Sequence, residues 1–262
     1  MEIHTVTEDA TEFTCNAYLL AGESPVLVDA GAMPGVEDVI AEHVDDLVAV
    51  YLTHQHGDHV GALDAVLNRF DADLYAYADH PRRTGGLDDG QVVDLCGDSY
   101  EVVHTPGHAE GHVSFVGADR VFSGDVVVYN DGAFDDGSFG RTDYPGQSRE
   151  RLIGSLETLL DRLPATVAEL YAGHGDVYRA APDGPGESVR TVIARPLARA
   201  GRRAPKYPDE CRRTRGLHSF EATAHEVSPW RMSRGAGFLR LGSEVLVPTL
   251  PVAVRATLVP GV

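Results

Sequence analysis

One loop constrains this chain more than any other stretch. Residues 53–59 read Thr-His-Gln-His-Gly-Asp-His, so three imidazoles and one carboxylate fall within a single short segment. The apolar run 47–53 leads into the loop and is typical of a buried strand, and residues 60–70 follow with apolar side chains at helical spacing. The loop therefore joins a strand end to a helix start, where a rigid scaffold aims side chains at a common point.

These residue types are suited to metal binding. Neutral imidazole and carboxylate groups are the ligands that Zn²⁺ binds when thiolates are absent, and Fe and Mn accept the same set. The spacing lets His54 and His56 hold one ion while Asp58 and His59 point toward a second. The simpler alternative is a solvated loop whose histidines cap the next helix. We favour metal binding because three later segments supply further ligands.

Each of these later segments follows an apolar, strand-like run and has glycine nearby. They carry His108 within 104–112, Asp125 in Phe-Ser-Gly-Asp, and His174 in Tyr-Ala-Gly-His-Gly. Taken singly, each would be an ordinary turn, but in this order after the His-rich loop they predict one metal site. We expect His104 and His112, which flank His108, to pack and to hydrogen-bond to ligands.

The rest of the chain alternates between strand and helix patterns. The expected strands are 15–22, 25–31, 47–53, 74–78, 99–105, 112–117, 120–127 and 167–173. The expected helices are 34–46, 60–70 and 148–163. Strands interspersed with helices imply an α/β (α+β) fold in which helices cover sheets.

A Pro/Gly-rich break at 181–187 predicts a domain boundary. We expect a catalytic domain over 1–189 and a C-terminal extension over 190–262, helical at first, kinked or ended at Pro196, and poorly ordered after about residue 210. The charge changes at the same place. Residues 1–189 contain 9 Arg, no Lys and 35 acids, a net −26, whereas residues 190–262 contain 13 basic residues and 5 acids, a net +8.

Composition excludes several kinds of partner. An acidic catalytic region repels nucleic acid and anionic membranes, and it resembles proteins from a salt-rich cytoplasm. The three cysteines form no CxxC pair, which argues against a disulfide framework or a zinc–thiolate site. The N-terminus has no signal-like segment, and no apolar run is long enough to span a bilayer, so we expect a soluble cytoplasmic protein.

Taken in order, these motifs resemble those of the metallo-β-lactamase superfamily over residues 10–178. The matching positions are Asp29, His54, His56, Asp58, His59, His108, Asp125 and His174. The resemblance implies a four-layer αββα sandwich with its metals at one edge of two sheets. It also implies one metal on His54, His56 and His108 and another on Asp58, His59 and His174, with Asp125 bridging. Asp29 would lie behind the ligands and steady the loop.

Residues 140–145, Gly-Arg-Thr-Asp-Tyr-Pro, together with Gly173-His174-Gly175, resemble the glyoxalase II and persulfide dioxygenase branch. This resemblance implies two divalent cations, zinc ahead of Fe or Mn, that activate a hydroxide to cleave an acyl thioester or related ester of a small molecule. Asp58 would also orient the nucleophile or shuttle its proton. Gly175-Asp176 stands where glutathione-binding members place an aromatic residue, so a different thiol carrier fits as well.

Other functions stay open on the sequence. A dioxygenase would need one iron on His54, His108 and Asp125. A lactonase or β-lactamase would use the same ligands as a thioester hydrolase. The acidic catalytic region argues against a nuclease. A non-catalytic binding module would be expected to lack at least one ligand, and the sequence retains all seven.

Overall fold

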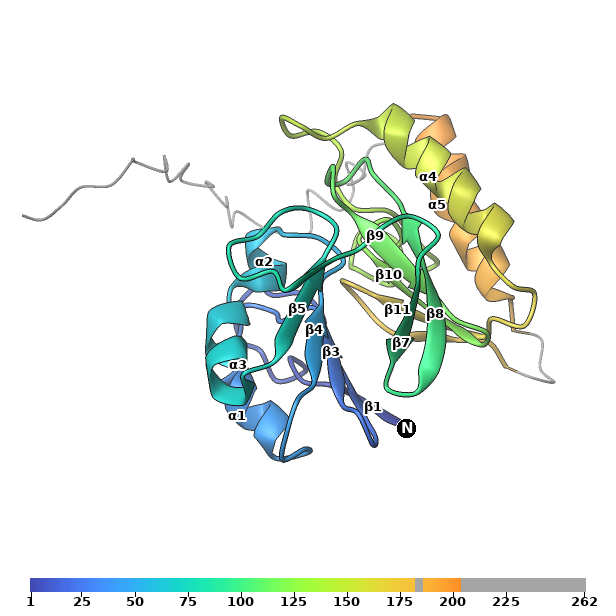
Figure 1. Ribbon diagram of the computed structural model, residues 1–262. Coiled ribbons are helices and arrows are strands. Elements are labelled where there is room, and N and C mark those ends of the chain that lie inside the picture. Colours follow the sequence, from blue (N-terminus) through green and yellow to red (C-terminus); the bar gives the residue numbers. More distant parts are fainter. Residues whose placement is uncertain (182–185, 204–262) are drawn as a thin grey trace, which may run out of the picture. The chain divides into compact units, whose positions relative to one another are not determined.

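A computed structural model describes residues 1–181 and 186–203. In this part of the chain two six-stranded sheets lie face to face, with helices over the outer face of each sheet (Figure 1). The layer order is helix, sheet, sheet, helix, which confirms the predicted αββα sandwich. The predicted disorder after about residue 210 concerns residues outside the described ranges.

The first sheet has the order β1-β2-β3-β4-β5-β6. Its strands are β1 (Glu2–Thr5), β2 (Tyr18–Ala21), β3 (Val26–Val28), β4 (Ala49–Tyr51), β5 (Asp73–Ala76) and β6 (Gly85–Gly86). From β3 to β6 the pairing is parallel, and helical crossovers join β3 to β4 and β4 to β5. The crossovers are α1 (Val36–Ala41), α2 (Gly57–Val60) and α3 (Leu63–Phe70). They bring the carboxyl ends of β3 and β4 to one edge.

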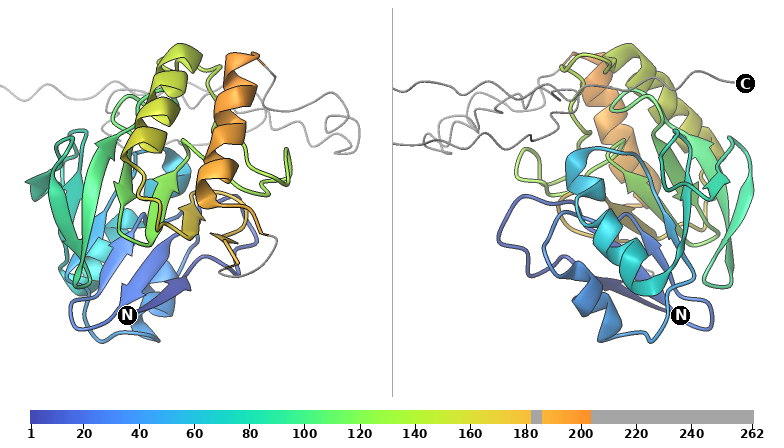
Figure 2. Two further views of the ribbon diagram at one scale, coloured as in Figure 1. Left: turned by 90° about the vertical axis from the view of Figure 1, so that its right-hand side faces the viewer. Right: turned by 60° about the vertical axis from the view of Figure 1, so that its left-hand side comes forward.

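The second sheet has the order β12-β11-β10-β9-β8-β7. Its strands are β7 (Val92–Leu95), β8 (Asp98–His104), β9 (Val113–Val116), β10 (Arg120–Gly124), β11 (Glu169–Ala172) and β12 (Tyr178–Arg179). Strands β10 and β11 are parallel and are joined by α4 (Arg149–Arg162). Helix α5 (Val189–Gly201) lies beside α4 (Figure 2). The carboxyl ends of β10 and β11 therefore reach the same edge.

Three clusters of buried apolar side chains fill the spaces between the layers. One joins the first sheet to α1 and α3 and includes Ile40. The second fills the space between the sheets and includes Phe115 and Phe122. The third joins the second sheet to α4 and α5 and includes Leu156 and Ile193. Both faces of the central strands are covered, which explains why their sequences are almost continuously apolar.

The structure differs from the expected elements in several places, and the two-residue strands β6 and β12 were not expected. Strands β1 and β7 were not expected, because each is short and lies at or next to the edge of its sheet with polar residues among the apolar ones. The strand expected over 120–127 ends at Gly124, where a φ of 51° turns the backbone out of the ladder. Helix α5 continues through Pro196 to Gly201, with the proline ring buried.

The domain boundary after residue 189 stays a prediction, but α5 lies beyond it and shares buried residues with α4. None of the helices in the described residues is long and apolar enough to cross a membrane.

We expect Ile193→Ala, which truncates a fully buried side chain of α5, to lower the free energy of unfolding by about 2–4 kcal/mol. Urea unfolding of the full chain measures the change. Ala198→Ser on the exposed side of the same helix is the control and should stay within about 0.5 kcal/mol of the parent. Equal effects of the two substitutions would show that α5 is not part of the cooperative core.

Candidate metal centre

The His-rich loop follows β4 and runs into α2. His54 and His59 are buried, with 2% and 0% of their surface exposed, and His56 is the residue immediately before the first turn of α2. That turn carries Asp58 and His59 on consecutive positions. The short helix therefore aims Asp58 and His59 differently from the two preceding histidines.

The second sheet supplies the other three predicted ligands. His108 lies in the loop after β8, Asp125 follows β10, and His174 follows β11. Because β10 and β11 are parallel neighbours, Asp125 and His174 emerge side by side. Gly173 makes this close approach feasible, since a Cβ there would lie 2.2 Å from Oδ1 of Asp125.

The seven predicted ligands converge in two groups. The ligand-forming atoms of His54, His56 and His108 all lie within 4.8 Å of one another. The same holds for Asp58, His59 and His174. Nε2 of His54 lies 3.0 Å from Nδ1 of His56, and Nε2 of His174 lies 3.0 Å from Oδ2 of Asp58.

Asp125 lies between the two groups. Its Oδ2 is 3.2 Å from Nε2 of His108 in the first group and 3.5 Å from Nε2 of His174 in the second. Its Oδ1 is 3.5 Å from Nε2 of His59. One carboxylate thus contacts both groups, which is the position that the resemblance assigned to a bridging ligand.

The donor atoms fit a divalent cation. Five buried side-chain atoms in the described residues have no hydrogen-bond partner, and three of them are Nε2 of His59, Nε2 of His108 and Oδ1 of Asp125. An unpaired buried polar atom costs about 1–3 kcal/mol, so three at one place need a compensating partner. Imidazole nitrogen and carboxylate oxygen are the donors that zinc and iron accept.

Hydrogen bonds behind the ligands orient their rings. Nδ1 of His59 donates to Oδ2 of Asp29 at 2.9 Å, and Nδ1 of His108 donates to the Arg141 carbonyl at 2.8 Å. Nδ1 of His54 donates to Oγ1 of Thr53 at 3.1 Å. With Nδ1 as the donor in all three rings, each Nε2 presents its lone pair to the shared site.

Asp29 links two of these three histidines, His59 directly and His54 through Thr53. Its carboxylate accepts from His59, from the Thr53 amide at 2.8 Å and from the Thr53 hydroxyl at 2.7 Å. The Thr53 hydroxyl in turn accepts from His54. The Asp29 backbone has a φ of 58°, the left-handed region that a non-glycine residue rarely adopts. The geometry thus gives Asp29 the steadying position that the resemblance implied.

Burial and charge set the protonation of His54, His56 and Asp125. Burial lowers the pKa of His54 well below its usual range, and burial together with the neighbouring His108 lowers the pKa of His56 to about 4. Both rings are therefore neutral, as metal ligation requires. Burial opposes the charge of Asp125, but His174 and His59 outweigh it and hold its pKa well below the usual value, so Asp125 is a carboxylate.

The two flanking histidines have supporting contacts. Nε2 of His112 accepts from the backbone amide of Asp125 at 2.9 Å, and its Nδ1 donates to Oγ1 of Thr105 at 2.8 Å. Both ring nitrogens of His112 are thus engaged in hydrogen bonds, and the ring holds the backbone of Asp125 in place. His104 stacks on Tyr77 with ring centres 4.2 Å apart and donates through Nε2 to the Glu110 carbonyl at 2.9 Å. Within the described residues, the expected hydrogen bond to a predicted ligand is therefore made by His112 and not by His104.

Sequence reasoning missed two residues that lie beside the site. Asn16 donates through Nδ2 to the carbonyls of Ala172 and Gly175, on either side of His174. The sulfur of Cys15 lies within 4.8 Å of the ligand-forming atoms of Asp29 and His59, but burial raises the pKa of its thiol to about 11, which makes it a poor ligand. Apart from their position in the loop before β2, neither Asn16 nor Cys15 has a sequence feature that would have identified it.

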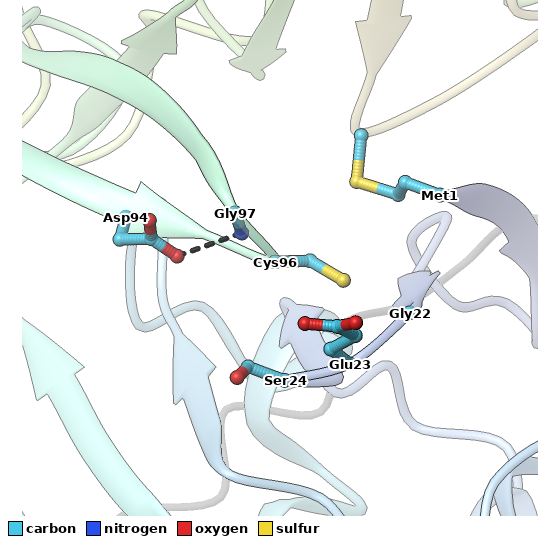
Figure 3. Close-up of a pocket in the computed structure, with 7 residues that line it drawn as sticks. All are labelled: Met1, Gly22, Glu23, Ser24, Asp94, Cys96 and Gly97. Carbon is cyan, nitrogen blue, oxygen red and sulfur yellow. Dashed lines mark hydrogen bonds between the residues drawn. The ribbon is translucent and has the colours of Figure 1, made fainter.

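A cavity of about 480 Å³ lies away from this cluster, between the β2–β3 turn and the β7–β8 turn (Figure 3). Its lining residues are Met1, Gly22, Glu23, Ser24, Asp94, Cys96 and Gly97. Both turns lie at the strand ends opposite to those that carry the predicted ligands. The cavity includes no histidine and is separate from the candidate metal centre.

Comparison with known proteins decides the family. Residues 10–174 match the model described as Metallo-beta-lactamase superfamily. The chain belongs to this superfamily. A curated relative, the hydroxyacylglutathione hydrolase of Xylella fastidiosa strain M23, is 34% identical over 109 residues, which cover 39% of this chain and 40% of the relative. The chain thus spans about two fifths of the length of that relative.

Two solved structures extend the comparison. ETHE1 from Myxococcus xanthus superposes with a TM-score of 0.58 at 23% identity, covering 78% of this chain and 88% of that one, and shows the shared fold. TTHA1623 in a di-iron-bound form superposes with a TM-score of 0.51 at 31% identity, covering 63% of this chain and 89% of that one. The chain is therefore a metallo-beta-lactamase superfamily member whose His/Asp cluster is suited to divalent metals.

We expect Asp29→Asn to reduce metal affinity about 10–100-fold, because the amide replaces a charged acceptor behind His59 and Thr53. Metal per chain after dialysis against graded chelator measures the loss. Asp161→Asn removes an exposed carboxylate on α4 and serves as the control. Unchanged metal retention in Asp29→Asn would contradict an orienting role for this carboxylate.

We also expect Gly173→Ala to abolish stoichiometric metal binding, because the added Cβ would displace Asp125 and would approach His59 to 3.0 Å. Gly154→Ala on α4 meets no atom within 4 Å and should bind metal like the parent. Elemental analysis of the two purified variants makes the comparison. A fully loaded Gly173→Ala variant would show that Asp125 does not need its observed position.

Proposed function

We propose that this protein is a dinuclear metal-dependent hydrolase that cleaves an acyl thioester or a related ester of a small molecule. The observation that carries the proposal is the complete second group, Asp58, His59 and His174, beside the three-histidine group. Asp125 lies within 3.5 Å of both groups, so it would bridge two ions. The name of the Xylella fastidiosa relative supports the thioester class.

The residues of the site would divide the work as follows. His54, His56 and His108 would hold one ion, and Asp58, His59 and His174 the other. When bound, two divalent cations lower the pKa of a water molecule from about 15.7 toward ~7 and polarise a carbonyl oxygen. This chemistry needs no serine or cysteine nucleophile. We propose zinc as the native metal, with iron or manganese as alternatives that the same donors accept.

Asp58 is positioned for a second task. Its side chain is 18% exposed, whereas that of Asp125 is 6% exposed, so Asp58 alone of the two carboxylates reaches toward solvent. Its Oδ2 contacts Nε2 of His174 at 3.0 Å. Burial raises the pKa of Asp58, but the hydrogen bond to His174 and the charge of His59 outweigh burial and lower it. We propose that this carboxylate, kept ionised by these contacts, orients the attacking water or shuttles its proton.

The charge of the protein bears on the substrate. Residues 1–189 carry a net −26 with no lysine, which disfavours phosphate-rich polymers and supports a small substrate. Beside His174, the exposed Asp176 accepts a hydrogen bond from Asn130 at 2.6 Å. A carboxylate at this position supports a thiol carrier other than glutathione, because glutathione is itself anionic.

The second candidate is a persulfide dioxygenase-like oxidoreductase with one iron on His54, His108 and Asp125. Such an enzyme has no need for a second complete ligand group, and Asp58, His59 and His174 form one. A lactonase or β-lactamase of the same fold would use the same donors as a thioester hydrolase. Substrate turnover, rather than ligand geometry, separates these hydrolases.

We expect the purified full chain to contain two divalent metal ions and to hydrolyse acyl thioesters without consuming oxygen. Elemental analysis, an oxygen electrode and a panel of thioesters, lactones, β-lactams and persulfides test this. One iron per chain with oxygen uptake on a persulfide would favour the dioxygenase instead.

We further expect His56→Ala and Asp125→Ala to lower kcat/KM at least 1,000-fold, on the order of the loss seen when an electrostatic catalytic group is removed. Circular dichroism should show that both variants keep the parent fold. His43→Ala, at an exposed position outside the site, is the control and should keep parent activity. Full activity of either site variant after metal removal would contradict the proposed chemistry.

A further inference from the structure

An exposed aromatic ring lies against one of the predicted metal ligands. Phe13 is 70% exposed, and its ring stacks on His174 with centroids 5.1 Å apart and planes 15° from parallel. Stacking covers one face of the phenyl ring and leaves most of the side chain open to solvent. In the described residues, four other large apolar side chains have about half or more of their surface exposed. None of these four stacks on a predicted ligand.

The loop that carries Phe13 is fixed on both sides of the second ligand group. The Cys15 amide donates to the Asp58 carbonyl at 3.2 Å, and the Asn16 amide donates to the Gly173 carbonyl at 2.7 Å. Directly after Phe13 in the sequence, Oγ1 of Thr14 accepts from the Ala32 amide at 2.7 Å. Phe13 is therefore held in place by its neighbours rather than by burial of its own side chain.

Simple packing does not account for this arrangement. A phenylalanine that served only to cover His174 would gain most by being buried, yet Phe13 keeps 70% of its surface in water. The loop around it is acidic, with Glu8, Asp9 and Glu12 close in sequence. An open ring face on an anchored loop beside a catalytic ligand is suited to contact an apolar group of a bound small molecule.

We propose that Phe13 is a specificity-determining residue that binds the acyl group of the substrate and selects aromatic or alkyl acyl groups over small polar ones. The inference rests on the proposed hydrolase function, because it places the reacting carbonyl at the neighbouring ligand groups. The scissile carbonyl lies at the two ligand groups, and the carbon chain attached to it extends over the free face of the Phe13 ring.

Turnover of a matched substrate series tests the proposal. The full-length, metal-loaded protein is assayed with acetyl, butanoyl and phenylacetyl thioesters of N-acetylcysteamine. Phe13→Ser should lower kcat/KM about tenfold for the phenylacetyl thioester, less for the butanoyl thioester, and under twofold for the acetyl thioester. Phe13→Tyr keeps the ring and should keep the preference of the parent.

The control is Val48→Ser, which removes an exposed apolar side chain at the end of β4 opposite to the His-rich loop. It should leave all three substrates unaffected. Metal content of Phe13→Ser should equal that of the parent. A parallel loss of metal, or an equal loss of activity on all three thioesters, would show that Phe13 only shields His174 and would overturn the proposal.

A binding arm separates this inference from the proposed function. Calorimetric titration of the metal-loaded protein with phenylacetate and with acetate measures acyl-group recognition without turnover. Phe13→Ser should weaken phenylacetate about tenfold and leave acetate unchanged. If the parent hydrolyses no thioester but shows this pattern, the proposed reaction fails and the acyl site stands. If Phe13→Ser affects both carboxylates equally, the acyl site fails.

Discussion

The buried carboxylate of Asp29 is the interaction on which the rest of the site depends. It is 2% exposed and accepts three hydrogen bonds, two from Thr53 and one from His59. A buried charge is costly unless it is well paired, so this carboxylate fixes the groups that satisfy it. It joins the end of β3 to the loop after β4 and, through Thr53, sets the ring of His54.

The second sheet meets this arrangement through backbone geometry. Parallel pairing of β10 and β11 brings Asp125 and His174 to the same edge, and glycines at 124 and 173 allow the strands to end close together. His112 then holds the Asp125 amide from the β9 side. The first sheet thus supplies a ligand loop fixed by side chains, and the second supplies ligands fixed mainly by where its strands stop.

Much of this was predictable because the ligands lie at the ends of apolar runs. The order of His54, Asp125 and His174 along the chain, each after a strand-like segment, predicted their convergence, and the resemblance of the ordered motifs to a known superfamily implied the sandwich. Strands β1 and β7 could not be predicted, since short strands at the edge of a sheet are stabilised by pairing rather than by their own apolar pattern. Helix α5 continues through Pro196 because its buried face outweighs the one hydrogen bond that proline removes.

The supporting contacts were beyond sequence reasoning for a different reason. The group that orients His108 is the Arg141 carbonyl, and a backbone oxygen leaves no trace in the identity of the residue that carries it. The stacking of Phe13 on His174 joins residues that are far apart in the chain, in a loop without periodicity. Such contacts follow from tertiary placement, which no local pattern encodes.

The position of Asn16 has a mechanical consequence. Its side chain grips the turn after β11, its neighbour Cys15 is tied to α2, and the Tyr18 hydroxyl donates to the Ala172 carbonyl at 2.6 Å. The bonds of Asn16 and Tyr18 join the first sheet to the second, beside the metal-binding side chains that each sheet contributes. Sliding of the two sheets past each other would have to break several of these bonds at once. Thermal motion of one sheet relative to the other is therefore smaller at this edge than away from it.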